Sequence, residues 1–129
     1  MAPDQTGTNT FTDTVLPDWS DYEPVHADRR NLRIHLIAVP LFDIGFIAAL
    51  TFLARADFIS AIVSLLVAFG SMVSQAKGHA KEAIAPRPFK GLPDFLKRWF
   101  SEQYLIFPLF VLSGRWWRQY QAADFDDSP

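Results

Sequence analysis

The sequence predicts an all-α fold: a small helical membrane protein with an antiparallel transmembrane hairpin and a kinked helix at the interface or in the membrane. Two apolar runs, residues 36–54 and 58–76, are separated only by the tripeptide Arg-Ala-Asp. Each run has about 19 residues, or ~28 Å as a helix, close to the ~30 Å hydrocarbon core of a bilayer. A third hydrophobic stretch, residues 94–114, contains a proline.

Charge is segregated along the 129-residue chain and divides it into three regions. Residues 1–28 carry six acidic residues and no Lys or Arg, and their Thr, Asp and Pro content predicts an extended or disordered acidic arm. Residues 29–121 form the predicted single helical membrane domain, and residues 122–129 are an acidic tail. The chain has no cysteine, which excludes disulfides, zinc-thiolate sites and thiol catalysis.

The two apolar runs lack the polar stripe that a helix on the surface of a soluble protein repeats every 3.6 residues. Residues 58–76 carry no charge, and residues 36–54 carry only Asp43. Two buried helices of a soluble bundle are the alternative. A chain of this size has too little protein to cover two helices that are apolar on all faces, so we favour an integral membrane protein.

The connector at residues 55–57 is too short for anything except a tight antiparallel turn. The start of the first helix and the end of the second must then lie at the same membrane face. This arrangement brings His26 and His35 close to His79, although up to 53 residues separate them in the sequence.

Basic residues gather at the histidine end of the predicted hairpin. Those that flank it are Arg29, Arg30, Arg33, Lys77, Lys81, Arg87, Lys90, Lys97 and Arg98. The opposite turn carries only Arg55, next to Asp57. By the positive-inside rule, the histidine face is cytoplasmic. This topology explains the basic charge better than nucleic-acid binding, which we do not expect.

Residues 94–114 are expected to form the kinked third helix. Asp94 is a suitable N-cap, and the first half alternates apolar and charged residues as an interfacial helix does. The second half, YLIFPLFVL, is apolar and contains Pro108, which predicts a kink where the helix dips into the bilayer or packs on the hairpin. The following RWWRQYQ, residues 115–121, is typical of an aromatic and basic interface anchor.

Polar residues at the histidine end follow helical spacing. Asn31 and His35 are four residues apart, and His79 and Glu82 are three apart, so each pair shares a helix face. Two facing helices that each present a histidine can form a metal site, and imidazoles with a carboxylate suit iron, manganese or zinc. His26 lies before the first helix and can fold over this site. The alternative is a set of interfacial polar residues without a ligand.

Two further features of the helices leave their roles open. Asp43 lies inside a membrane segment, where a charge costs ~2.5–3.5 kcal/mol on insertion scales. It either lines a substrate cavity or pairs with a hydroxyl of the second helix, such as Ser64. Gly70, Ser74 and Gly78 recur every four residues, a spacing that lets helices approach closely within the hairpin or in a dimer.

A longer pattern resembles the 2-hydroxy fatty acid dioxygenase family, small multi-pass membrane proteins of fatty acid α-oxidation with many bacterial members. The resemblance covers about residues 22–114 and is closest to a bacterial branch of the family. It therefore implies that the protein is located in a bacterial inner membrane. It rests on His26-x4-Asn31-x3-His35, then Pro40 in the apolar run, then Gln75-x2-Gly78-His79 and Glu82.

The resemblance implies an enzyme that uses Fe2+ and O2 to shorten a 2-hydroxy fatty acid by one carbon. The implied metal ligands are His26, His35 and His79. Glu82 would be a fourth ligand or would orient an imidazole, and Asn31 would hydrogen bond behind the ligands. Glu102 is a further candidate on the third helix.

The implied substrate is a fatty acyl chain from the membrane, whose tail enters an apolar slot between the hairpin and the Phe-rich third helix. Its carboxylate would sit at the interface, held by charge-assisted hydrogen bonds. The candidate substrate-binding residues are Arg29, Arg30, Arg33 and Lys77, with Asp43 in the slot.

A non-catalytic membrane subunit is the competing prediction. In that case, the small-residue face and the acidic arm would serve assembly, as a homo-oligomer or within a larger membrane complex. The histidines would then bind lipid head groups or a pigment. Bound metal separates the two predictions, because only the enzyme requires it.

Overall fold

The computed structural model describes residues 17–123, and within that range all regular structure is helical, as the sequence predicts. Most of the predicted acidic arm and the end of the acidic tail lie outside these residues. The elements are α2 (Trp19–Tyr22), the 3-10 turn η1 (Glu23–Val25), α3 (Arg29–Ala54), α4 (Phe58–His79), α5 (Leu92–Ser101), the π-helical turn η2 (Glu102–Ile106), α6 (Phe107–Leu112) and α7 (Arg115–Ala122).

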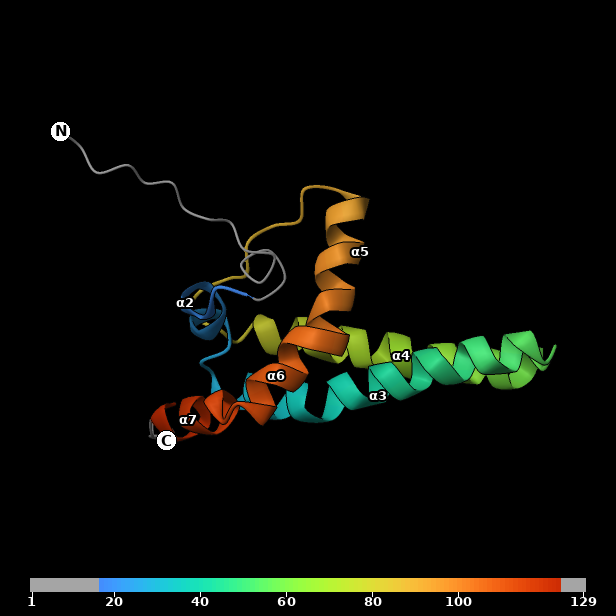
Figure 1. Cartoon of the computed structure of the whole chain (residues 1–129), viewed down its shortest axis with the longest axis horizontal. Helices are drawn as coiled ribbons and strands as arrows, with labels where there is room; N and C mark the ends of the chain where they lie inside the picture. Colours follow the sequence, from blue (N-terminus) through green and yellow to red (C-terminus); the bar gives the residue numbers. More distant parts are fainter. Residues whose placement is uncertain (1–16, 124–129) are drawn as a thin grey trace.

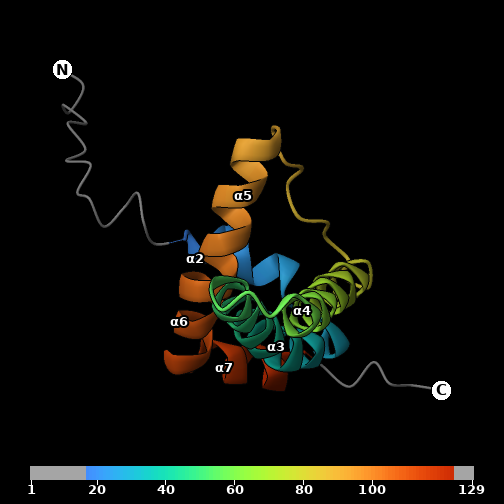
Figure 2. The ribbon, with the colours of Figure 1, turned by 90° about the vertical axis from the view of Figure 1, so that its right-hand side faces the viewer.

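The two long helices α3 and α4 lie side by side and run in opposite directions (Figures 1 and 2). The Asp28 side chain caps the start of α3 by accepting hydrogen bonds from the first backbone N–H groups, and Asp57 does the same for α4. Between the helices, Ala56 adopts a left-handed φ of 56°, which helps the chain reverse within three residues.

Gly45 allows the two helices to approach closely midway along their length. A Cβ at this position would lie 3.0 Å from the Ser64 carbonyl oxygen and 3.1 Å from the Ala68 amide nitrogen. Of the small residues that the sequence singled out, Gly70 has open space beside it, whereas Gly78 is packed tightly against α3.

Both α3 and α4 are long and apolar enough to cross a membrane. Only 28% of the most apolar stretch of α3, and 22% of that of α4, is buried inside the protein, so neither is a covered core helix. In Figure 1, the part of the hairpin nearest the turn has no other element beside it. Exposed apolar side chains in that part include Ile47, Leu50, Ile59 and Ile62.

The stretch predicted as one kinked third helix is divided into α5, η2 and α6. Helix α5 projects away from the hairpin, and the chain then turns through η2 into α6, which lies beside α3 (Figure 1). Pro108 is the second residue of α6 and comes directly after η2. It has no N–H to donate to the preceding turn, so one helical hydrogen bond is missing there. The wider π-helical turn directs two successive side chains inward, so that Glu102 contacts Tyr22 and Gln103 contacts Gln75.

Helix α7 is fastened to the start of α3. The Trp116 indole Nε1 donates a hydrogen bond of 3.1 Å to the Leu32 carbonyl oxygen. The Arg29 guanidinium lies 4.7 Å from the centre of the Tyr120 ring and also donates to the Tyr120 carbonyl oxygen.

Residues 19–28, the N-terminal strap, differ from the extended or disordered arm that the sequence predicts for residues 1–28. They contain α2 and η1, and the Asp18 side chain caps α2 by accepting from the Ser20 N–H. Tyr22 is buried, with its ring 5.1 Å from that of Phe110, and the Trp19 ring stacks on the same phenylalanine. Burial of these two aromatic rings outweighs the acidic, proline-containing composition that indicated an open chain.

The buried apolar core sits at the end of the hairpin opposite the turn. Its members are Tyr22, Leu32, Val39, Phe107, Phe110 and Trp116. The core therefore joins the strap to α3, α6 and α7, and the strap packs with the domain predicted for residues 29–121. This end of the molecule also holds the histidines.

Candidate metal centre

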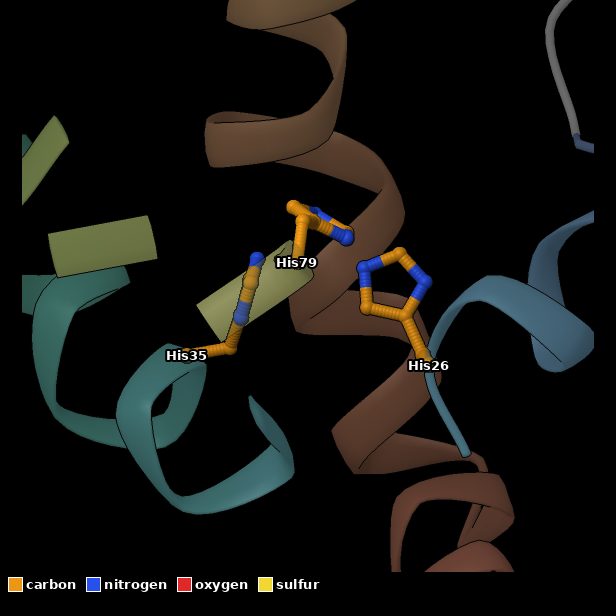
Figure 3. A group of neighbouring side chains, drawn as sticks. All are labelled: His26, His35 and His79. Atoms are coloured by element: carbon orange, nitrogen blue, oxygen red, sulfur yellow. The ribbon is translucent and has the colours of Figure 1, made fainter. Parts of the chain in front are cut away.

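Three histidine side chains meet at the core end of the hairpin (Figure 3). The ring centroids are 5.1 Å apart for His26 and His35, 4.8 Å for His26 and His79, and 4.7 Å for His35 and His79. One nitrogen from each ring lies within 4.8 Å of the other two. A group of this kind can hold a metal ion.

Each histidine comes from a different segment. His35 lies in the second turn of α3, His79 is the last residue of α4, and His26 follows η1 in the strap. The reversal at residues 55–57 brings the first two together, and the strap places the third against them (Figure 3). The structure thus gathers the three histidines that the sequence singled out.

The hydrogen bonds of the imidazoles leave one nitrogen of each ring available for a ligand. His26 Nδ1 is 3.0 Å from the Tyr22 carbonyl oxygen, and His35 Nδ1 is 3.1 Å from that of Asn31. The His79 ring is hydrogen bonded to the backbone of Val25. A bond to a carbonyl fixes the N–H on that nitrogen and leaves a lone pair on the other.

The remaining nitrogens fit a metal centre. Buried His26 Nε2, His35 Nε2 and His79 Nδ1 have no hydrogen-bond partner among residues 17–123. Burying an unpaired polar atom is costly, so three of them gathered in one group call for a shared partner. Neutral imidazoles with a neighbouring carboxylate suit iron, manganese or zinc.

The neighbouring carboxylate is Glu102 of η2. Its Oε1 lies 3.5 Å from His26 Nε2 and accepts a hydrogen bond of 2.6 Å from the Tyr22 hydroxyl. Burial alone would raise the pKa of Glu102, but the positive charge of a protonated His26 and the hydrogen bond from the Tyr22 hydroxyl hold it below its usual range. Burial, reinforced by the Glu102 charge, raises the pKa of Tyr22 well above its usual value.

Glu82, predicted as a fourth ligand or an orienting residue, lies outside this group of three and secures the strap. Its carboxylate accepts hydrogen bonds from the N–H of Ala27 at 3.1 Å, the N–H of Asp28 at 2.9 Å and the Asn31 side-chain amide at 2.6 Å. Asn31 therefore joins Glu82 to α3, and both act behind the histidines. Together they hold the backbone that follows His26.

Gly78 makes room for this arrangement. It precedes His79, and a Cβ at this position would collide with Asn31 Oδ1. Asn31 is fully buried, so it has little space to move away. The glycine is therefore needed because the end of α4 touches the Asn31 side chain.

The walls of the site are apolar, with one polar pair behind them. The Phe107 ring lies 5.7 Å from that of His35, and the Phe110 ring 6.1 Å from that of His26. Gln75 and Gln103, each at most 1% exposed, exchange two hydrogen bonds of 3.0 and 2.8 Å. This pair ties α4 to η2 and so fixes the turn that carries Glu102.

The basic residues predicted to bind the substrate carboxylate lie around the site. Arg29 is directed to Tyr120 of α7. Arg30, Arg33 and Lys77 are exposed at the same end of the hairpin.

Asp43 lies two helical turns beyond His35, in a groove between α3 and α6. Its Oδ1 is buried without a hydrogen-bond partner in the described part of the chain. The predicted pairing with Ser64 does not occur, because the Ser64 hydroxyl donates to the Ser60 carbonyl oxygen.

Sequence reasoning gave Tyr22 and Gln103 no role at the site and ranked Glu102 below Glu82. Tyr22 is four residues before His26, a spacing that would have put both on one side of a helical turn. The π-helical turn that directs Glu102 and Gln103 inward has no signal in the pattern of apolar residues.

Comparisons with protein-family models, curated proteins and solved structures found no match to this chain.

Proposed function

We propose that the chain is an Fe(II)-dependent dioxygenase of the inner membrane that shortens 2-hydroxy fatty acids by one carbon. The main support is the convergence of three histidine nitrogens that have no hydrogen-bond partner among the described residues. The donor set suits zinc and manganese as well, and the preference for iron follows from the resemblance to the dioxygenase family.

The proposed topology is a hairpin of α3 and α4 that spans the bilayer. Length, composition and the exposure of their apolar side chains support it. Exposed Arg30, Arg33 and Lys77 lie at the histidine end, whereas the turn carries Arg55 with Asp57. By the positive-inside rule, the histidine end faces the cytoplasm.

The overall reaction needs no further redox cofactor. A 2-hydroxy acid, R–CH(OH)–COOH, and O2 give R–COOH, CO2 and H2O, so the four electrons released by the two carbons reduce one O2 completely. Bound Fe(II) would supply an open position where O2 and the hydroxy acid meet. An iron site with three protein ligands and open positions meets this requirement.

The residues of the chain would hold the metal ion and accept a proton from the substrate. His26, His35 and His79 would hold the ion, with their rings fixed by backbone hydrogen bonds. Glu102 Oε1 accepts a hydrogen bond from the Tyr22 hydroxyl, and this carboxylate would be the nearest base for the 2-hydroxyl proton of the substrate.

The surroundings of the site would control access. The Phe107 and Phe110 rings would exclude water from the reacting carbons. Exposed Arg30, Arg33 and Lys77 would attract the anionic head group to this end of the hairpin.

The test is a metal analysis followed by an assay. Protein purified in detergent and loaded with Fe(II) should retain about one iron per chain, because the three histidines form a single group that can hold one ion. The double variant His35→Ala, His79→Ala should lose it. Ile59→Ala, at an exposed position on the same hairpin, is the matched control and should retain it.

With O2, 2-hydroxypalmitate should then yield the acid one carbon shorter. Absence of bound metal in a folded protein would overturn the enzyme proposal and leave the non-catalytic subunit. Bound iron without any product would overturn the assigned reaction.

A further inference from the structure

A groove lies where α6 packs beside α3, and it has a volume of about 450 Å³. Val39 and Pro40 of α3 form one wall, and Phe107, Pro108 and Val111 of α6 form the other. Both the volume and the apolar walls are typical of sites for small molecules.

The groove borders the histidine site, although none of the three histidines is among its lining residues. Leu36, which follows His35 in the chain, lines it, and so does Phe107, whose ring is 5.7 Å from that of His35. Ile44 lines the end of the groove farther along α3, and it is exposed. Leu112 is also exposed and lies at the end of α6 that leads into α7. Phe107 belongs both to the groove wall and to the surroundings of His35, so a tail that lies in the groove has its head end beside the histidine site.

Two hydrogen-bond acceptors interrupt the apolar wall. Asp43 lines the groove, and its buried Oδ1 has no partner within residues 17–123. Pro40 has no N–H to donate, so the Leu36 carbonyl one turn earlier lacks its usual helical donor. Neither acceptor would be satisfied by a plain hydrocarbon chain.

We propose that this groove binds the hydrocarbon tail of the substrate lipid, and that Asp43 accepts a hydrogen bond from a second hydroxyl on that tail. The identity of the head group rests on the proposed function. Asp43 follows His35 by eight residues, or ~12 Å along the helix, so the second hydroxyl lies well along the chain.

A second groove, with a similar volume of about 470 Å³, shows whether unsatisfied polar groups are a general feature of grooves on this protein. It lies on the contact of α3 with α4 and is lined by Ile37, Gly70 and Ser74. Its serine hydroxyls are satisfied, because Ser71 donates to the Val67 carbonyl oxygen and Ser74 to that of Gly70. It therefore offers no polar group that needs a ligand.

The first test locates the tail. Iron-loaded protein in detergent is mixed with 2-hydroxypalmitate that carries a diazirine near its tail, irradiated and analysed by peptide mass spectrometry. We expect adducts in residues 36–44 and 107–112 that excess unlabelled 2-hydroxypalmitate removes. Adducts spread over exposed residues such as Ile59 and Ile62, and resistant to competition, would overturn the groove assignment.

The second test addresses Asp43 through competition for the same photolabel. A chain with an added mid-chain hydroxyl should bind about tenfold more tightly than 2-hydroxypalmitate, the factor expected for about one hydrogen bond. Asp43→Leu should remove this preference and leave the iron content unchanged. Equal binding of both chains to the wild-type protein would overturn the role of Asp43.

Steric variants complete the design. Ile44→Trp should block the far end of the groove and weaken binding of the long chain, while Ile37→Trp places the same bulk in the second groove and should have no effect. Both positions are exposed on α3, at 67% and 65%, so neither change should prevent folding. If the groove is labelled but no product forms, the groove assignment stands and the proposed reaction is refuted. If product forms but the label lies elsewhere, the proposed reaction stands and the groove assignment is refuted.

Discussion

Glu82→Ala should weaken metal binding although Glu82 lies outside the three-histidine group. Its carboxylate accepts hydrogen bonds from three donors, the N–H groups of Ala27 and Asp28 and the amide of Asn31. Hydrogen bonds to charged groups contribute ~1.5–3 kcal/mol each, but Ala27 is exposed and water replaces its bond. The Asn31 amide belongs to α3, so the bond from the Asp28 N–H is the main one that Glu82 makes to the strap. We therefore expect a loss of about 2 kcal/mol from the docking of the strap, or about thirtyfold in its equilibrium.

Hydrogen–deuterium exchange and chelator competition together test this reasoning. Exchange in residues 19–28 should accelerate in Glu82→Ala, and metal affinity should fall because His26 belongs to the strap. Glu82→Gln keeps one carbonyl acceptor and should show a smaller effect on both. A fall in affinity with unchanged exchange would refute the strap mechanism and favour Glu82 as a direct ligand.

Three further outcomes are expected. Gly78→Ala should lower both melting temperature and metal content, because its Cβ collides with Asn31, whereas Gly70→Ala, with open space beside it, should lower neither. Gln75→Leu should destabilise the protein by about 1–3 kcal/mol in denaturant unfolding, because Gln103 is left buried and unpaired, and adding Gln103→Leu should recover part of this loss. Removing the metal with a chelator should lower the melting temperature in proportion to the logarithm of free metal, and no shift on adding Fe(II), Mn(II) or Zn(II) would contradict metal binding.

The convergence of the histidines was predictable, because it follows from one local fact. A connector of three residues leaves only an antiparallel reversal, which puts His35 near His79 whatever the details of packing. The position of His26 was open, since the composition of the strap indicated an extended chain. Its order depends on contacts distant in sequence, such as the bond between Tyr22 and Glu102, 80 residues apart.

The role of the carboxylates was less accessible from the sequence. Helical spacing placed Glu82 on the same face as His79, but the nearby backbone of the strap offers it N–H donors that the spacing does not reveal. Glu102 comes close to the histidines only because η2 is π-helical and Gln75 holds that turn through Gln103. A change of helical register that depends on a tertiary hydrogen bond leaves no pattern in the local sequence.

In the proposed enzyme, the charge balance of the site would decide which head groups it accepts. Three imidazoles bind a metal in their neutral form, and the positive charge of a bound divalent ion would favour the ionised form of Glu102 beside it. A divalent ion in this surrounding retains one positive charge, which a monoanionic carboxylate would neutralise. Arg30, Arg33 and Lys77 therefore need not enter the site and can act from the surface by raising the local concentration of anionic lipid.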